Sequence, residues 1–115
     1  MNVEEYLRKI NCIEFKDKQP SLENLKILQQ NHILQFPFEN LDLHMGKPIL
    51  FSLENSYNQL IKNSRGGYCI QLNSCFGWLI EQLGYKFDFY PTYVYNQFLK
   101  SYYRLPIHMI LVVKL

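Results

Sequence analysis

Apolar residues recur at the spacing of one helix face in four stretches between residues 3 and 83. The first stretch predicts a short amphipathic helix at the start of the chain. In the second, Pro20 and Ser21 give a break and an N-cap, and Glu23 stands in the first turn, where the helix dipole favours an acid. The apolar positions of these two helices are Val3, Tyr6, Leu7 and Ile10, followed by Leu22, Leu25 and Leu28.

Two more helices are predicted on either side of a Gly-Gly pair at 66–67. Ser52 caps the third helix, which ends before that pair. The fourth begins at Tyr68 or Cys69 and stops at Gly84, in the C′ position. Their apolar positions are Leu53, Tyr57, Leu60 and Ile61, followed by Cys69, Leu72, Phe76, Leu79 and Leu83. Residues 36–51, which contain two prolines and a glycine, predict an ordered loop between the second and third helices.

The hydrophobic pattern changes from period 3.6 to period 2 after Gly84. Alternating aromatic residues from 85 to 90 predict a strand that breaks at Pro91, and the Tyr-Val-Tyr run at 93–95 predicts another. An almost unbroken apolar run from 107 to 113 predicts a buried strand. Helices first and strands second favour an α+β fold, with a helical domain at 1–84 and strands at 85–115. The chain ends at the last strand without a hairpin partner to cover its edge, so we expect a truncated chain.

Composition and charge narrow the classes of partner. The chain has 115 residues, of which 48% are apolar, enough for one compact core. Its net charge of +2 includes no run of Lys or Arg longer than a pair, so we expect neither nucleic acid nor an anionic membrane as partner. No apolar run is long enough to span a bilayer and the start does not resemble a signal peptide, so we expect a cytoplasmic protein.

The most informative segment for chemistry is Arg-Gly-Gly-Tyr-Cys at 65–69. Two glycines allow an unusual backbone path, an arginine lies close by, and Cys69 is delivered to a helix N-terminus. Helix N-termini and nearby cations lower the pKa of a thiol and make it nucleophilic. The alternative is that Cys69 is a small buried core residue, which is the usual role of cysteine. The three cysteines, an odd number with no two-residue spacing, favour reduced thiols and give no support for a zinc site.

A thiolate nucleophile needs an imidazole within hydrogen-bond reach, and His108 is the best candidate. Strand alternation places His108 on the face shared with Ile110 and Val112. The alternative is a core histidine with its hydrogen bonds satisfied. We expect His32 and His44 to be surface or capping residues.

Four segments, in order, resemble successive signatures of the arylamine N-acetyltransferases. They are Phe-Pro-Phe-Glu-Asn-Leu at 36–41, the segment 65–69 with Gln71 and Asn73, Tyr-Val-Tyr at 93–95, and the pair Ile107 and His108. The resemblance implies a cysteine-protease-like core, in which this chain supplies the helical domain and the first strands of an incomplete β-barrel. It also implies that Cys69 takes an acetyl group from acetyl-CoA and passes it to an arylamine or hydrazine, with His108 as base and with no metal. Cys12 and Cys75 match no catalytic position, and we interpret both as packing residues.

The resemblance extends to the substrate pocket, but it leaves one catalytic position unfilled. Phe38 and Val94 match residues that line the amine pocket, and Ile107 matches one beside the catalytic histidine, although ordinary core packing explains all three equally well. The family has an Asp about fifteen residues after the histidine to orient it. Only seven residues follow His108 here. The segment Arg-Leu-Pro at 104–106 also replaces a small residue and a glycine that contact the cofactor in many members.

Three functional hypotheses remain open at this point. The first is an N-acetyltransferase of which these residues are the N-terminal portion, and which is a monomer when complete. The second is an inactive fragment or a non-catalytic binding protein of the same family. The third is a Cys-His hydrolase or transglutaminase-like protein, which shares the nucleophile-base pair but leaves the segment 36–41 unexplained.

Overall fold

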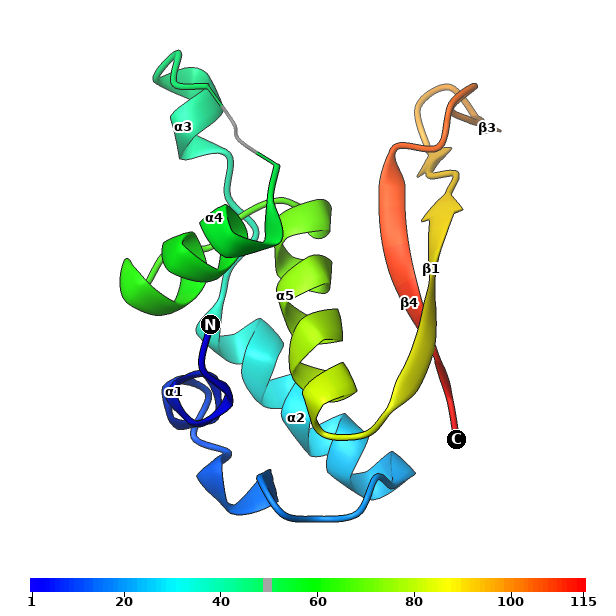
Figure 1. Ribbon diagram of the computed structural model, residues 1–115. Helices are drawn as coiled ribbons and strands as arrows, with labels where there is room; N and C mark the ends of the chain where they lie inside the picture. Colours follow the sequence, from blue (N-terminus) through cyan, green and yellow to red (C-terminus); the bar gives the residue numbers. More distant parts are fainter. Residues whose placement is uncertain (49–50) are drawn as a thin grey trace.

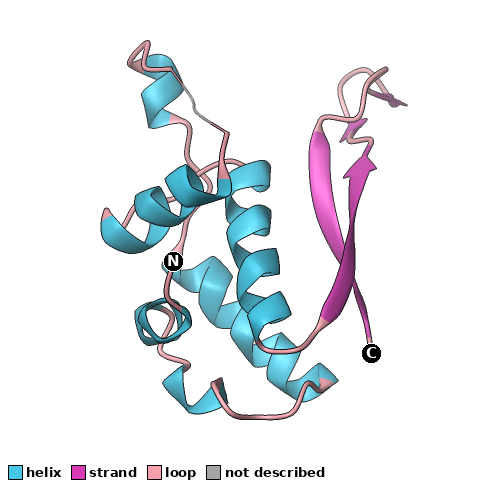
Figure 2. Ribbon diagram, viewed as in Figure 1, coloured by secondary structure: helices cyan, strands magenta, loops and turns pink. Residues whose placement is uncertain are grey.

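The computed structural model describes residues 1–48 and 51–115, and it confirms the α+β class. All the helices precede Leu83 and all the strands follow Tyr85 (Figures 1 and 2). The helical elements are α1 (Val3–Lys9), η1 (Ile13–Phe15), α2 (Leu22–Gln35), α3 (Leu41–His44), α4 (Leu53–Tyr57), η2 (Asn58–Lys62) and α5 (Cys69–Gln82). The strands are β1 (Lys86–Thr92), β2 (Tyr95–Asn96), β3 (Ser101–Tyr102) and β4 (His108–Lys114).

The strands form two separate antiparallel ladders. β1 pairs with β4 along its whole length, from Lys86 opposite Lys114 to Thr92 opposite His108. The short strands β2 and β3 pair beyond the end of this hairpin. Within the described residues these ladders do not close into a barrel. The long hairpin lies beside α5, and the first turn of the helix is next to the end of the hairpin that carries His108 (Figure 1).

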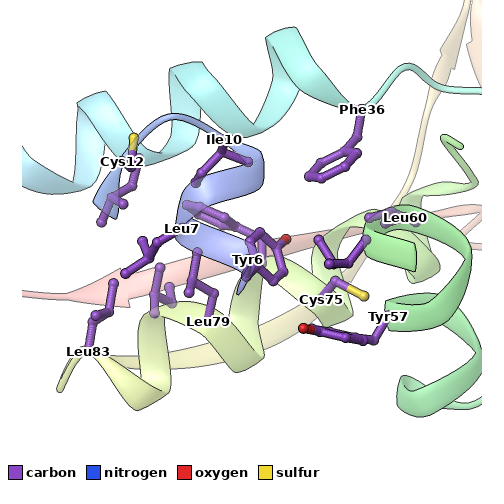
Figure 3. Packing of buried hydrophobic residues seen from close by; sticks show 14 of the residues in the cluster. Tyr6, Leu7, Ile10, Cys12, Phe36, Tyr57, Leu60, Cys75, Leu79 and Leu83 are labelled. Atoms are coloured by element: carbon purple, nitrogen blue, oxygen red, sulfur yellow. The ribbon is translucent and has the colours of Figure 1, made fainter. Parts of the chain in front are cut away.

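A single hydrophobic cluster joins the helices. Figure 3 shows side chains from α1, α4 and α5 meeting under Phe36, which follows α2. The aromatic rings of Tyr6 and Tyr57 belong to this cluster, with their centroids 6.3 Å apart, and both residues are almost fully buried. Phe87, Leu111 and Val113 of the hairpin pack against its edge. The cluster therefore fixes α5, which in turn supports the strands.

Local sequence signals account for the helix ends that were predicted. The Ser21 hydroxyl accepts a hydrogen bond from the backbone N–H of Asn24 at 3.1 Å, and Ser52 does the same for Asn55 at 3.1 Å. Gly84 takes a positive φ of 88° after Leu83, the C-cap of α5, as expected for a C′ glycine. The predictions of α1, α2, α5 and these caps are confirmed.

The segment between α2 and α4 is more regular than the predicted loop. A one-turn helix, α3, forms at Leu41–His44 because the Glu39 carboxylate accepts the backbone N–H of Leu41 at 2.9 Å. Phe36 is buried there, whereas Phe38, Leu41 and Leu43 are exposed. The third predicted helix is also divided, since α4 passes into the π-helical turn η2. The part of the predicted loop at 49–50 lies outside the described residues.

Three of the strand predictions were wrong in detail. Pro91 does not break β1, because this strand pairs with β4 along one edge only, and an edge strand tolerates a residue without an N–H. Only Tyr95 of the predicted strand at 93–95 is paired. The predicted buried strand at 107–113 is half-buried, with Ile110 and Val112 exposed, since one face of a two-stranded ladder packs against the helices.

The apolar stripe of α2 also differs from the prediction. Leu28 is buried, but Leu22 is exposed, and the buried face continues instead to His32, which is only 4% exposed. His32 Nδ1 lies 2.9 Å from the hydroxyl of Tyr6, and the His32 ring packs against Phe36 and Phe76. The expectation that His32 is a surface or capping residue was therefore wrong. His44 is exposed, as expected.

We predict that His32 makes stability depend on pH. Burial lowers its pKa from 6.5 to about 4, so unfolding takes up a proton between these values. The contribution of the His32 side chain to the free energy of unfolding is complete above pH 6.5 and is lost as the pH falls toward 4. Between pH 7 and pH 5 the free energy of unfolding should fall by about 2 kcal/mol more in the wild type than in His32→Phe. Urea unfolding at both pH values measures this, and equal falls in the two proteins would contradict it.

Candidate functional site

The site is built where the backbone of Gly66 and Gly67 meets that of Pro37 and Phe38. The Gly67 N–H donates to the Pro37 carbonyl at 3.1 Å, and the Glu39 N–H donates to the Gly67 carbonyl at 3.2 Å. A Cβ atom on Gly66 would lie 1.7 Å from the Pro37 carbonyl oxygen, and one on Gly67 would lie 2.6 Å from Gln71 Oε1. Glycine is therefore required at Gly66, where the two backbones approach closely, whereas a side chain at Gly67 would have to displace the Gln71 side chain.

Two glutamines fix the turn that leads into α5. Gln71 Oε1 accepts the backbone N–H of Tyr68 at 2.9 Å, which satisfies one of the donors at the helix start. Gln71 Nε2 donates to Gln59 Oε1 at 3.0 Å, and Gln59 Nε2 donates to the Gly66 carbonyl at 2.7 Å. Gln71 is buried, so this chain of hydrogen bonds holds the first turn of α5, and with it Cys69, in one orientation.

Arg65 serves the same turn through ion pairs. Its Nε donates to Glu39 Oε1 at 2.9 Å, and one terminal nitrogen donates to Asp42 Oδ2 at 2.8 Å. These hydrogen bonds, the one with Asp42 first, raise the pKa of the Arg65 guanidinium above its usual value. Arg65 is therefore engaged by two carboxylates of the 36–42 segment.

Cys69 differs from the other two cysteines in accessibility. It is the first residue of α5 and is half-buried, whereas Cys12 and Cys75 are completely buried. Burial raises the pKa of Cys12 to about 11 and that of Cys75 to about 12, which keeps both thiols protonated at neutral pH. The three cysteines are free. Cys12 and Cys75 are packing residues, as expected, and Cys69 is the thiol that a reagent in solution can reach.

His108 and Cys69 line the same pocket. This pocket has a volume of about 360 Å³, and its remaining lining residues are Phe38, Phe51, Tyr68, Ile70 and Ile107. The rings of Phe38 and His108 are tilted toward each other, with their centroids 6.5 Å apart. The structure therefore brings together four of the five residues predicted for the site, from the 36–41 segment, from the start of α5 and from the start of β4. Phe51 and Ile70 were not predicted as site residues, because apolar residues near a turn carry no distinctive sequence signal, and Tyr68 was identified only as part of the 65–69 segment.

Val94 is the predicted site residue that does not line this pocket. It lies between β1 and β2, where its carbonyl accepts the backbone N–H of Tyr103 at 3.1 Å, and its side chain is exposed. Its role in binding an amine stays a prediction. In the described ranges, 1–48 and 51–115, no cluster of three or more His, Cys, Asp or Glu side chains could hold a metal ion. No helix in these ranges combines the length and the apolar character needed to cross a membrane.

We predict that Gly66→Ala destabilises the protein strongly. The added methyl group would overlap the Pro37 carbonyl, which belongs to the backbone and cannot rotate away, so the free energy of unfolding should fall by about 3 kcal/mol or more. Gly46→Ala is the matched control. Its Cβ meets no atom within 4 Å, so only its positive φ of 67° opposes the change, at about 1 kcal/mol. Urea unfolding that finds the two variants equally stable would refute the close approach at Gly66.

Comparison with known proteins identifies similar chains. A family profile described as N-acetyltransferase matches residues 21–115. The pineal gland isozyme NAT-10 of arylamine N-acetyltransferase from Gallus gallus is 36% identical over 110 residues, which are 96% of this chain and 38% of that protein. Arylamine N-acetyltransferase 1 from Homo sapiens is 33% identical over 111 residues, with the same coverage of 96% and 38%. The chain thus spans about 38% of the length of these curated relatives.

Solved structures show the same relation. The arylamine N-acetyltransferase from M. tuberculosis superposes with a TM-score of 0.85 at 29% sequence identity, over 99% of this chain and 42% of that one. The match extends over both the helices and the hairpin, since it includes almost the whole chain.

Proposed function

Because the chain belongs to the arylamine N-acetyltransferase family, we propose that Cys69 accepts an acetyl group from acetyl-CoA and passes it to the nitrogen of an arylamine or hydrazine. The observation that carries the proposal is that Cys69, the one cysteine of three that is not fully buried, shares a pocket with His108. A thiol beside an imidazole at a helix N-terminus is the arrangement that nucleophilic catalysis requires.

In the first half-reaction, the His108 imidazole takes the proton from the Cys69 thiol, and the thiolate attacks the acetyl carbonyl carbon of acetyl-CoA. The bond from that carbon to the CoA sulfur breaks, and the imidazolium returns the proton to the departing CoA thiolate. Cys69 is the first residue of α5, so the positive end of the helix dipole lies next to the sulfur on which negative charge develops in this step. The product is an acetyl thioester on Cys69.

In the second half-reaction, the amine nitrogen attacks the thioester carbonyl and His108 takes a proton from it. The Cys69 sulfur leaves as a thiolate, and proton return from His108 restores the starting enzyme. Phe38 and Ile107 give the pocket apolar walls that suit an aromatic ring, and we assign them to acceptor binding together with Val94. We divide the chain at residue 84 into a helical domain with the nucleophile and strands with the base. Free thiols fit a reducing compartment such as the cytoplasm.

A second candidate function is that of a family member that binds these small molecules without transferring acetyl groups. Within residues 1–48 and 51–115, no carboxylate makes a hydrogen bond or ion pair with His108. An orienting carboxylate holds the imidazole in the correct tautomer in triad enzymes, and its removal lowers the rate by several orders of magnitude. Acetylation of Cys69 is compatible with both functions, and release of the acetyl group to an arylamine separates them.

We predict that acetyl-CoA acetylates Cys69. Intact mass spectrometry after incubation should show a gain of about 42 Da, since a thioester acetyl group replaces the thiol hydrogen. Tandem mass spectrometry should place it on Cys69, and addition of an arylamine should remove it with formation of the N-acetyl product. The Cys69→Ser variant should gain no acetyl group, whereas Cys75→Ala, which removes a buried thiol without adding a polar group, should still be acetylated on Cys69.

Two results would contradict the proposal in different ways. An acetyl group on Cys75 would show that Cys69 is not the nucleophile. No acetylation, in protein whose Cys69 still reacts with iodoacetamide while Cys12 and Cys75 stay protected, would show that the folded chain does not use acetyl-CoA. Acetylation without release to any arylamine would support the binding role.

A further inference from the structure

One side chain connects the helix of Cys69 to the strand of His108. Asn73 lies one turn after Cys69 on α5, and its Nδ2 donates a hydrogen bond to the backbone carbonyl of Met109 at 2.6 Å. Met109 directly follows His108 on β4. We propose that Asn73 is a positioning residue that fixes the start of β4 against α5, and so holds the His108 imidazole beside the Cys69 thiol. This inference rests on the proposed function of these two residues.

The geometry of α5 places Asn73 in line with the nucleophile. Residues four apart on a helix lie one above the other, so Cys69, Asn73 and Gly77 follow one line along the face toward the hairpin. Gly77 lets the strands come close, since a Cβ atom there would lie 2.9 Å from the Phe87 ring. Both the close approach and the hydrogen bond therefore come from the face of α5 that carries Cys69.

Apolar contacts alone would leave the position of β4 along α5 poorly defined. Phe87, Leu111 and Val113 press the hairpin onto the helical core, but hydrophobic contact is not directional. A hydrogen bond requires a distance near 3 Å and an aligned N–H. Asn73 supplies this directional contact at the His108 end, between a half-buried side chain and a half-buried strand.

His108 needs such a contact because it lies at the end of a ladder. Its partner Thr92 is the last residue of β1, and strand ends fray more readily than strand centres. His108 is one residue from Met109, so a fixed Met109 carbonyl limits where the imidazole can go. Loss of the Asn73 hydrogen bond would let this end of β4 move away from α5 and would separate the base from the thiol.

The test measures alkylation of Cys69 by iodoacetamide at neutral pH, which requires neither acetyl-CoA nor turnover. Asn73→Ala should slow alkylation at least about tenfold, because small displacements of a base cause large losses of rate. Asn31→Ala is the matched control, since Asn31 Nδ2 donates to the Ile27 carbonyl at 2.9 Å within α2 and far from Cys69 in sequence. Cys69 in Asn31→Ala should react with iodoacetamide at the wild-type rate. Asn73→Leu, which keeps the branched shape of the side chain without the donor, should be as slow as Asn73→Ala.

A double-mutant cycle separates positioning from general loss of structure. If Asn73 acts through His108, then Asn73→Ala should slow alkylation no further in a His108→Gln background. If Asn73→Ala slows alkylation equally in the wild-type and His108→Gln backgrounds, the proposal is overturned. Alkylation of Cys69 at the wild-type rate in both Asn73→Ala and Asn73→Leu would also overturn it. Alkylation of the buried Cys12 and Cys75 in Asn73→Ala would show that this variant is unfolded. The alkylation rate of Cys69 in Asn73→Leu then tests the proposal.

The outcomes also distinguish this inference from the proposed function. If the double-mutant cycle behaves as predicted while acetyl-CoA fails to acetylate Cys69, this pair of results would refute the transferase and keep Asn73 as a positioning residue. Acetylation of Cys69 at the wild-type rate in Asn73→Ala would support the transferase and refute the role of Asn73.

Discussion

The close approach of the Gly66 backbone to the Pro37 carbonyl is the constraint on which the rest of the site depends. It joins two segments that are almost thirty residues apart in the sequence, and it leaves no room for a Cβ atom. Arg65 secures the contact from one side through Glu39 and Asp42, while Gln59 and Gln71 secure it from the other. The direct result is that α5 begins at Cys69, with Phe38 beside it in the pocket.

The position of α5 then determines where the strands lie. One face of the helix is buried in the core through Leu72, Cys75 and Leu79, where each fully buried large side chain contributes about 1.5–3 kcal/mol. Another face meets the hairpin at Asn73 and Gly77. A helix held by a core cannot shift along its axis without breaking these contacts, so Cys69 has a defined position. Cys69 therefore lies on a helix that the core holds in place, and His108 lies on a half-exposed ladder.

Much of this arrangement was predictable from the sequence, and the failures have physical reasons. Helix periods, the caps at Ser21 and Ser52 and the C′ glycine Gly84 are local signals, so the helices could be placed. Tertiary partners are not local. The residues near Arg65 in the sequence do not show that its guanidinium forms ion pairs with Glu39 and Asp42. The sequence does not show that the Tyr6 hydroxyl meets His32 inside the core. Nor does it show that β1, which contains Pro91, pairs along one edge only within the described residues. Cys69, His108, Phe38 and Ile107 were predicted from the order of the motifs, whereas the pocket that they share required the fold.

The central claim is that Cys69 and His108 lie close enough to act on one substrate atom, and a short bifunctional alkylating reagent tests it directly. Dibromoacetone reacts first with an accessible thiol and then bridges it to a nucleophile only a few bonds away. Tandem mass spectrometry of the treated protein should find one cross-linked peptide pair, which joins Cys69 to His108. A Cys69 that is alkylated but never bridged, or that is bridged to His44 instead, would show that the strand carrying His108 does not meet the helix as described.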